Sequence, residues 1–163
     1  MSTTDELLAN AERYAENFDK ADLALPPSKK VAVVACMDAR LIPTRVLGLD
    51  EGEAHVIRNA GGVVDEDTVR SLAISQNLLG TEEIILIHHT DCGMLTFTDD
   101  ELADKLEQET GTRPSWSAHA FDSLEGDVKS SIDKLKNDPH IPNKGSIRGF
   151  VYDVESGGLT EVA

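Results

Sequence analysis

The hydrophobic positions of this chain fall into short continuous runs and into longer stripes with helical spacing. The continuous runs are VAVVA, within residues 30–35, and IILI, within 83–88. Unbroken apolar runs of this length are typical of parallel strands that are buried on both faces. A third segment, EAHVIR at 53–58, also has the character of a strand. Near the C-terminus, IRGFVYDVESGGLTEV predicts two short strands joined by a turn at 156–158.

Apolar residues spaced three and four positions apart predict helices between these strands. The expected helices cover residues 65–79, 98–110 and 123–137, with acidic residues at the start and a glycine after the end of the first two. A further amphipathic helix covers 4–19, and its apolar stripe consists of Leu7, Leu8, Ala11, Tyr14, Ala15 and Phe18. A proline-containing loop sets this helix apart, so it packs either on a neighbouring subunit or on the sheet of its own chain.

Strands that alternate with helices indicate an α/β fold. We expect a mostly parallel central sheet with flanking helices and an antiparallel edge hairpin at the C-terminus. The sequence contains no internal repeat, low-complexity tract or interdomain linker, which predicts a single domain over residues 1–163. In such folds ligands bind outside the carboxyl ends of the strands, so the residues that follow the apolar runs are the first candidates for a site.

The net charge of −15 and the pI near 4.5 narrow the range of partners. An acidic chain is repelled by nucleic acid and by anionic membranes, so neither is an expected partner. No apolar run is long enough to cross a bilayer, and the N-terminus has neither the basic residues nor the apolar stretch of a signal peptide. The expected location is the cytoplasm, a reducing compartment in which the two cysteines are free thiols.

Two cysteines and two histidines stand at the ends of the continuous apolar runs. Cys36 follows the first run, and His88, His89 and Cys92 follow the second. Thiolate and imidazole groups are ligands that Zn²⁺ prefers. The spacing favours His89 without excluding His88. Because the two thiols and one imidazole supply three ligands, the fourth position is left to water or to Asp38, and an exchangeable fourth position is typical of catalytic zinc.

Asp38 and Arg40 lie two positions apart, directly after the first candidate ligand. An arginine fork can hold a carboxylate with two hydrogen bonds. If Arg40 holds Asp38, the carboxylate is free to orient a zinc-bound hydroxide. If Asp38 turns to the metal, it becomes the fourth ligand. The loop Asn-Ala-Gly-Gly contains Gly61 and Gly62, where the missing side chains permit the close approach of a ligand.

Taken together, these segments resemble the β-class carbonic anhydrases. CMDAR at 36–40 and HTDCGM at 89–94 match the C-x-D-x-R and H-x-x-C signature of that family, and the RNAGG loop and the closing RGFVYDVESGGL segment match as well. The resemblance extends over most of the chain and is strongest to the small archaeal-type and actinobacterial branch. It implies that Cys36, His89 and Cys92 are the ligands of one Zn²⁺ per chain.

The same resemblance implies reversible hydration of carbon dioxide to bicarbonate and a proton, by a zinc-bound hydroxide. Asp38 and Arg40 are then the catalytic dyad, with Asp38 still a possible fourth ligand, and Gly61 and Gly62 lie at the substrate pocket. Members of the family are dimers or larger assemblies. A homodimer or higher homo-oligomer is therefore expected here.

Two alternative functions use the same residues. The zinc site could hydrolyse CS₂ or COS, as relatives of this fold do, because the sequence does not report the width of the pocket. A non-catalytic zinc-binding or redox-sensing module would need the two thiolates but not the Asp38–Arg40 pair. The presence of that pair favours an enzyme.

Overall fold

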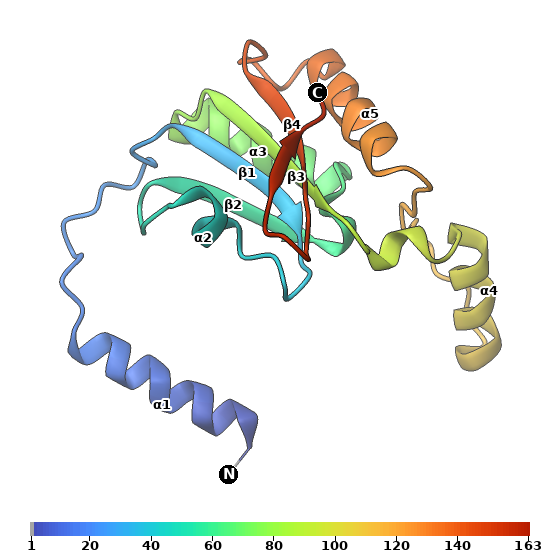
Figure 1. The fold of residues 1–163 in the computed structure, drawn as a ribbon, viewed down its shortest axis with the longest axis horizontal. Coiled ribbons are helices and arrows are strands. Elements are labelled where there is room, and N and C mark those ends of the chain that lie inside the picture. The colour runs from blue at the N-terminus through green and yellow to red at the C-terminus, as the bar shows by residue number, and fades with distance from the viewer. Residues whose placement is uncertain (1) are drawn as a thin grey trace.

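The centre of the computed structural model, which describes residues 2–163, is a five-stranded sheet (Figure 1). Its order is β2-β1-β3-β4-β5, with the first four strands parallel and β5 antiparallel to β4. The strands are β1 (Val31–Cys36), β2 (Ala54–Asn59), β3 (Glu83–His89), β4 (Ile147–Tyr152) and β5 (Leu159–Glu161). The expected α/β fold, with its antiparallel C-terminal hairpin, is confirmed.

The helices begin and end at the signals that the sequence provides. Asp65 precedes α3, and its carboxylate accepts a hydrogen bond from the backbone nitrogen of Thr68 at 2.8 Å. Helices α3 and α4 are each followed by a glycine in the left-handed conformation, as expected for C-terminal caps. The helices are α1 (Thr3–Glu16), α2 (Pro43–Leu47), α3 (Glu66–Leu79), α4 (Asp99–Thr110) and α5 (Leu124–Asn137).

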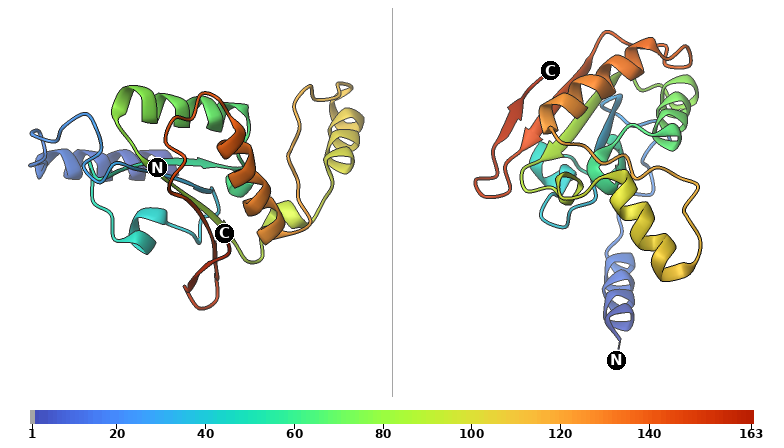
Figure 2. Two further views of the ribbon diagram at one scale, coloured as in Figure 1. Left: turned by 90° about the horizontal axis from the view of Figure 1, so that it is seen from above. Right: turned by 90° about the vertical axis from the view of Figure 1, so that its right-hand side faces the viewer.

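Side chains of the sheet form two hydrophobic cores, one on each face. All six residues of β1 are buried, as expected for a central parallel strand. One face is covered by α3 and α5, which contribute Leu72 and Val128 (Figure 2). The opposite face is covered by α2 and by the loops that follow β1 and β3, and its core includes Cys36, Leu41 and Cys92. The candidate ligands are therefore held in a packed environment.

Helix α1 projects away from the sheet (Figures 1 and 2). None of its residues is buried, and Leu7, Leu8 and Tyr14 are 55–60% exposed. A hydrogen bond from the Tyr14 hydroxyl to Glu51 Oε1, at 3.0 Å, ties the end of the helix to the turn before β2. The alternative in which this helix packs on its own sheet is wrong, because no residue of the helix is buried.

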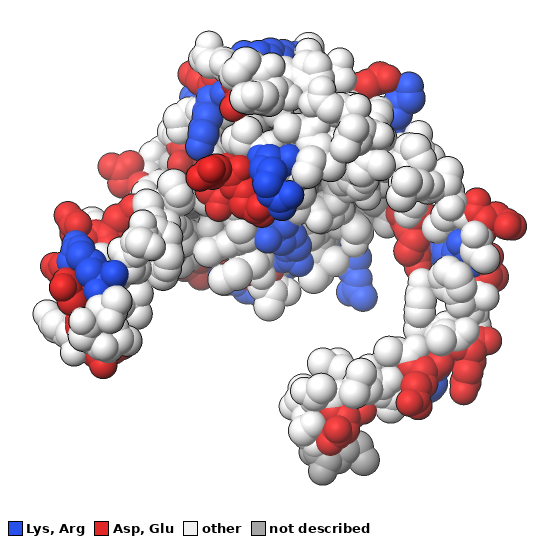
Figure 3. Space-filling model, turned by 180° about the vertical axis from the view of Figure 1, so that it is seen from behind, with Lys and Arg blue, Asp and Glu red and all other residues white. Residues whose placement is uncertain are grey.

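Acidic side chains are prominent on the two helices that project from the body. Figure 3 shows Asp and Glu along both α1 and α4. The first turn of α4 contains Asp99, Asp100 and Glu101, where the helix dipole favours negative charge. Within residues 2–163, no helix combines the length and the apolar content needed to cross a bilayer.

Candidate metal centre

The candidate ligands meet where two neighbouring strands end. Cys36 is the last residue of β1 and His89 the last residue of β3, and these strands pair in parallel. Cys92 follows β3 after a short turn. The sulfur atoms of the two cysteines and a ring nitrogen of His89 lie within 4.8 Å of one another, and all three residues are buried. The carboxyl ends of these two strands thus bring together the two sulfur atoms and one nitrogen atom that the sequence suggested.

The alternation of side chains along β3 separates the two histidines. His88 faces α5, where its Nε2 lies 2.7 Å from Asp127 Oδ2 and its ring stacks on Phe121. His89 faces the other side of the sheet and joins the cysteines. The structure therefore places His89, and not His88, in the cluster.

The ring of His89 is oriented for coordination. Its Nδ1 lies 2.7 Å from the carbonyl oxygen of Thr90. Because a carbonyl can only accept, this contact places the ring proton on Nδ1 and leaves Nε2 as an acceptor. Among residues 2–163, Nε2 is buried and has no hydrogen-bond partner. A buried polar atom without a partner is costly, and a metal ion would supply the missing contact.

The two thiols lie close enough to influence each other's ionisation. A hydrogen bond from the Cys92 thiol lowers the pKa of Cys36. The neighbouring Cys36 sulfur raises the pKa of Cys92, because a second thiolate would place two negative charges side by side in a buried site. A divalent cation removes this opposition by pairing with both thiolates. Donor types and charge therefore both fit Zn²⁺.

Asp38 and Arg40 form a bidentate pair beside these ligands. Arg40 Nε donates to Asp38 Oδ1 at 3.0 Å, and Arg40 Nη2 donates to Asp38 Oδ2 at 2.8 Å. These hydrogen bonds hold the pKa of Asp38 well below its usual range, so its carboxylate is ionised and acts as an acceptor. Asp38 Oδ2 lies 3.7 Å from His89 Nε2, which places the pair at the border of the candidate metal position.

Arg40 also contacts the turn that carries the other candidate ligands. Its Nη1 donates to Asp91 Oδ2 at 2.9 Å, and its Nη2 donates to the Asp91 carbonyl oxygen at 3.1 Å. Asp91 lies between His89 and Cys92 in the sequence. Arg40 thus bridges the loop after β1 and the turn after β3. Asp91 was not predicted as a site residue, and its place between two candidate ligands was the one available signal.

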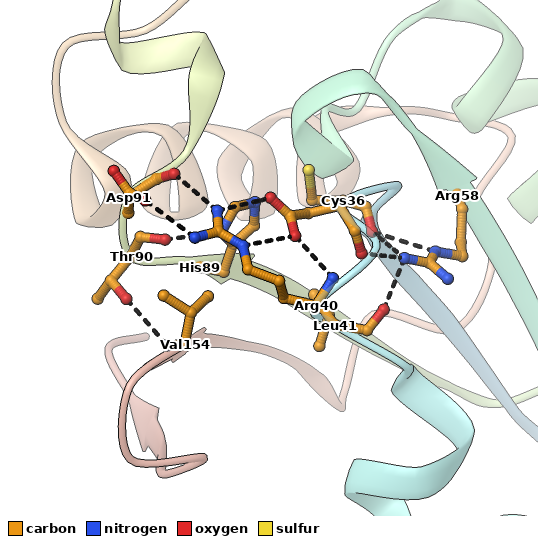
Figure 4. A network of polar contacts seen from close by, with 9 residues as sticks. Cys36, Arg40, Leu41, Arg58, His89, Thr90, Asp91 and Val154 are labelled. Carbon is orange, nitrogen blue, oxygen red and sulfur yellow. Dashed lines mark hydrogen bonds and ion pairs between the residues drawn. The ribbon is translucent and has the colours of Figure 1, made fainter.

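A second arginine, Arg58 of β2, holds the opposite side of the loop after β1. Its Nε and Nη2 donate to the Cys36 carbonyl oxygen at 3.1 and 2.9 Å. Its Nη2 also donates to the carbonyl oxygens of Asp38 and Leu41, at 2.8 and 2.6 Å. Three backbone carbonyl groups therefore converge on one guanidinium group (Figure 4). Sequence reasoning did not identify Arg58, because no residue pattern reports where backbone carbonyl groups point.

Gly61 and Gly62 lie directly behind the candidate ligands. Both are buried and both have positive φ, +87° and +66°. A Cβ atom at Gly62 would lie 2.7 Å from the backbone nitrogen of Cys36 and 2.9 Å from the carbonyl carbon of Ala35. The missing side chain thus lets the loop after β2 pack against the end of β1. That these glycines line the substrate pocket stays a prediction.

Comparison with known proteins identifies the relatives of this site. The family model described as carbonic anhydrase matches residues 31–144. β-Carbonic anhydrase 1 of Mycobacterium tuberculosis is 56% identical over 162 residues, which cover 99% of each chain. The crystal structure of a carbonic anhydrase from Streptococcus mutans has a TM-score of 0.93 at 41% identity and covers 100% of this chain and 99% of that chain.

A carbon disulfide hydrolase of Acidianus is also similar. It is 34% identical in an alignment 179 positions long, which covers 95% of this chain and 86% of the relative. The identity to the mycobacterial enzyme is clearly higher. Both relatives bear the names of enzymes and match this chain over nearly its whole length, which argues against the non-catalytic zinc-binding or redox-sensing module. With the family model, the full-length relatives and the cluster of Cys36, His89 and Cys92 in agreement, the chain belongs to the β-carbonic anhydrases, zinc enzymes whose family reaction is the hydration of carbon dioxide.

Proposed function

We propose that this chain catalyses the reversible hydration of carbon dioxide to bicarbonate and a proton. The observation that carries the proposal is the cluster of Cys36, His89 and Cys92 beside a carboxylate that an arginine holds in place. Two buried sulfur atoms and a buried imidazole nitrogen would hold one Zn²⁺ per chain. When bound, Zn²⁺ would supply the Lewis acidity that lowers the pKa of water. That pKa is about 7 where the protein ligands are neutral, and the two thiolates of this site would keep it higher.

In this proposal, Asp38 orients the oxygen atom that reacts with carbon dioxide. Its ionised carboxylate accepts a hydrogen bond and has no proton to donate. Accepting that bond from a water or hydroxide fixes the oxygen atom, so that a lone pair faces the carbon atom of carbon dioxide. In the reverse direction the same acceptor binds the hydroxyl group of bicarbonate, which is the one O–H that this substrate carries.

Arg40 and the two glycines prepare the site around Asp38. Because Arg40 engages both carboxylate oxygen atoms, we assign Asp38 the role of acceptor rather than that of fourth metal ligand. We place Gly61 and Gly62 at the substrate pocket. A Cβ at Gly61 would lie 2.9 Å from Met94 Cγ, so a larger residue there would push this apolar side chain out of position.

We further propose that the enzyme is a cytoplasmic homodimer or higher homo-oligomer. The exposed apolar stripe of α1 supports the association, because a row of large apolar side chains on a projecting helix is typical of a contact surface. Both cysteines are free, which supports a reducing compartment. The net charge of −15 disfavours nucleic acid and anionic membranes as partners.

Stopped-flow hydration of carbon dioxide by the zinc-loaded protein, with zinc assayed on the same sample, tests the proposal. The expected result is one zinc per chain with rapid turnover. Asp38→Ala should retain zinc and lose about a hundredfold or more in kcat/KM. Asp67→Ala is a matched control, because Asp67 also pairs with an arginine, Arg70, at 2.8 Å, but on the exposed surface of α3. This control should keep full activity.

Two results would contradict the proposal in different ways. One zinc per chain without turnover at neutral or alkaline pH would exclude carbonic anhydrase activity, and CS₂ and COS would then be the substrates to test. Full activity in Asp38→Ala would leave the reaction in place and remove the role assigned to the dyad.

A further inference from the structure

Asp91 is a carboxylate at the candidate site for which the proposed reaction has no direct use. Its carboxylate is directed to Arg40 (Figure 4). We propose that Asp91 is a positioning residue, which fixes the guanidinium group of Arg40 so that this group holds Asp38 in its working orientation. The inference rests on the proposed function of the Asp38–Arg40 dyad.

The first argument is the way in which Arg40 distributes its donors. Nε donates to Asp38, Nη1 donates to the Asp91 carboxylate, and Nη2 is shared between Asp38 and the Asp91 carbonyl oxygen. A guanidinium group is planar, so a contact that fixes one edge also fixes the direction of the other edge. Asp91 therefore determines where the edge that faces Asp38 points.

The second argument is the exposure of the arginine. The Arg40 side chain is 47% exposed, so surrounding side chains do not hold it by close packing. Its position depends mainly on its hydrogen bonds. Asp38 alone would leave the guanidinium free to pivot about the bidentate pair, and the two contacts with Asp91 remove that freedom.

The third argument is the backbone of Asp91. Its φ is +54°, a left-handed conformation that is uncommon for residues other than glycine. This conformation presents both the carbonyl oxygen and the carboxylate to one guanidinium group. The side chain itself is 79% exposed and adds nothing to a core. The contacts with Arg40 therefore explain why this exposed residue has an unusual backbone conformation.

The consequence is a mechanical link between the two halves of the site. Asp91 lies in the turn between His89 and Cys92, whereas Arg40 and Asp38 lie in the loop after β1. Arg40 ties the dyad to the turn that carries two of the three candidate ligands. The distance between the acceptor and the metal position is then set by this link.

The test is a double-mutant cycle with Asp91→Asn and Arg40→Ala. Asparagine keeps the shape of the side chain and tolerates the left-handed backbone, and it removes the charge that strengthens the hydrogen bond. We expect Asp91→Asn to lower kcat/KM about fivefold with zinc content unchanged, as for the loss of an exposed ion pair. In the Arg40→Ala background it should cause no further loss. The matched control, Asp67→Asn, should leave kcat/KM unchanged.

A second measurement reports on the arginine directly. In nitrogen-15-labelled protein, the Nε–H signal that disappears in Arg40→Ala belongs to Arg40. In Asp91→Asn this proton should exchange with water several-fold faster than in the unsubstituted protein, because the guanidinium group is less restrained. This readout does not depend on turnover, and an effect of the Asp91 charge on substrate approach would leave it unchanged.

Several outcomes would overturn the inference. Equal losses in kcat/KM from Asp91→Asn in both backgrounds would mean that Asp91 acts through its charge and not through Arg40. Unaltered activity and unaltered Nε–H exchange in Asp91→Asn, with Arg40→Ala inactive, would refute the positioning role and leave the dyad intact. Full activity of Arg40→Ala would refute the dyad itself.

Discussion

At the scale of single residues, the position of Cys36 depends on a neighbour that has no side chain. A Cβ atom at Gly62 would approach the backbone nitrogen of Cys36 to 2.7 Å, and the carbonyl carbon of Ala35 to 2.9 Å. The φ of Gly62, +66°, adds strain for any other residue. Backbone atoms of a central strand cannot be displaced as a flexible side chain can. Relief of the clash must therefore move the candidate ligand.

We expect Gly62→Ala to lower the free energy of unfolding by about 2–5 kcal/mol, from left-handed strain and overpacking together. It should also weaken zinc binding. Gly48→Ala is the control, because Gly48 has a similar φ of +63° and no atom lies within 4 Å of the place that its added methyl group would take. It should cost the strain alone, about 1–2 kcal/mol. Urea unfolding and chelator competition measure both effects, and equal losses in the two variants would contradict the importance of the contact.

Residue patterns predicted the candidate metal ligands but not the residues that hold the surrounding loops in place. Cys36 and His89 could be identified because zinc-binding side chains stood at the ends of two buried strands, where an α/β fold places its ligands. The contacts of Asp91 and Arg58 depend on the conformations of two loops, which place carbonyl groups and carboxylates in space. Turn conformations of this kind are specified by several residues together and by tertiary packing, so no short motif reports them.

At the scale of elements, α5 packs on β4 with a glycine at the contact. A Cβ atom at Gly149 would lie 2.1 Å from Val128 Cγ1, and Val128 is fully buried. The same helix carries Asp127, which pairs with His88 next to the candidate ligand His89. The distance between α5 and the sheet is therefore coupled to the strand end that carries the ligand.

We expect Gly149→Ala to destabilise the fold by about 1–3 kcal/mol through overpacking. Val128→Ala should cost about 2 kcal/mol through the cavity that it leaves. In the double variant the added methyl group occupies the space that was vacated, so the total loss should be smaller than the sum by about 1 kcal/mol or more. Denaturant unfolding of the three variants measures the coupling. Additive losses would show that the helix can move away from β4 at little cost.

The types of the elements could be predicted where the local pattern was strong, but their arrangement in space could not be predicted. The apolar runs identified β1 and β3, and acidic starts with glycine ends identified α3 and α4. The position of β1 between β2 and β3 is a property of the crossovers, which hydrophobic runs leave open. The packing of α5 on β4 depends on Gly149, whose role is visible only when the helix is in place.

At the scale of the whole molecule, the sequence pattern predicted helix α1, but the rest of the described chain does not cover its apolar face. Its stripe of Leu7, Leu8 and Tyr14 is exposed, and the helix projects clear of the sheet (Figure 1). The hydrogen bond from Tyr14 to Glu51 holds one end of the helix and leaves the apolar face uncovered. In the proposed homodimer this face packs on the partner subunit. A sequence pattern can mark such a face, but the residues that cover it belong to another chain.

The association of α1 with a partner can be tested by introducing a glutamate on the apolar stripe of the helix or on its polar face. Leu8→Glu puts the charge on the apolar stripe, and Arg13→Glu puts it at an exposed position on the polar face of the same helix. Burial of one leucine contributes about 1.5–3 kcal/mol, so Leu8→Glu should raise the dissociation constant of the dimer about tenfold or more. Sedimentation velocity over a range of protein concentrations measures this shift, and circular dichroism verifies that both variants keep their helices. Arg13→Glu, although it changes the charge by more, should associate as the unsubstituted chain does. Equal dissociation of both variants would mean that charge repulsion, and not the apolar stripe, controls assembly, and unchanged association of Leu8→Glu would mean that the subunits meet through another surface.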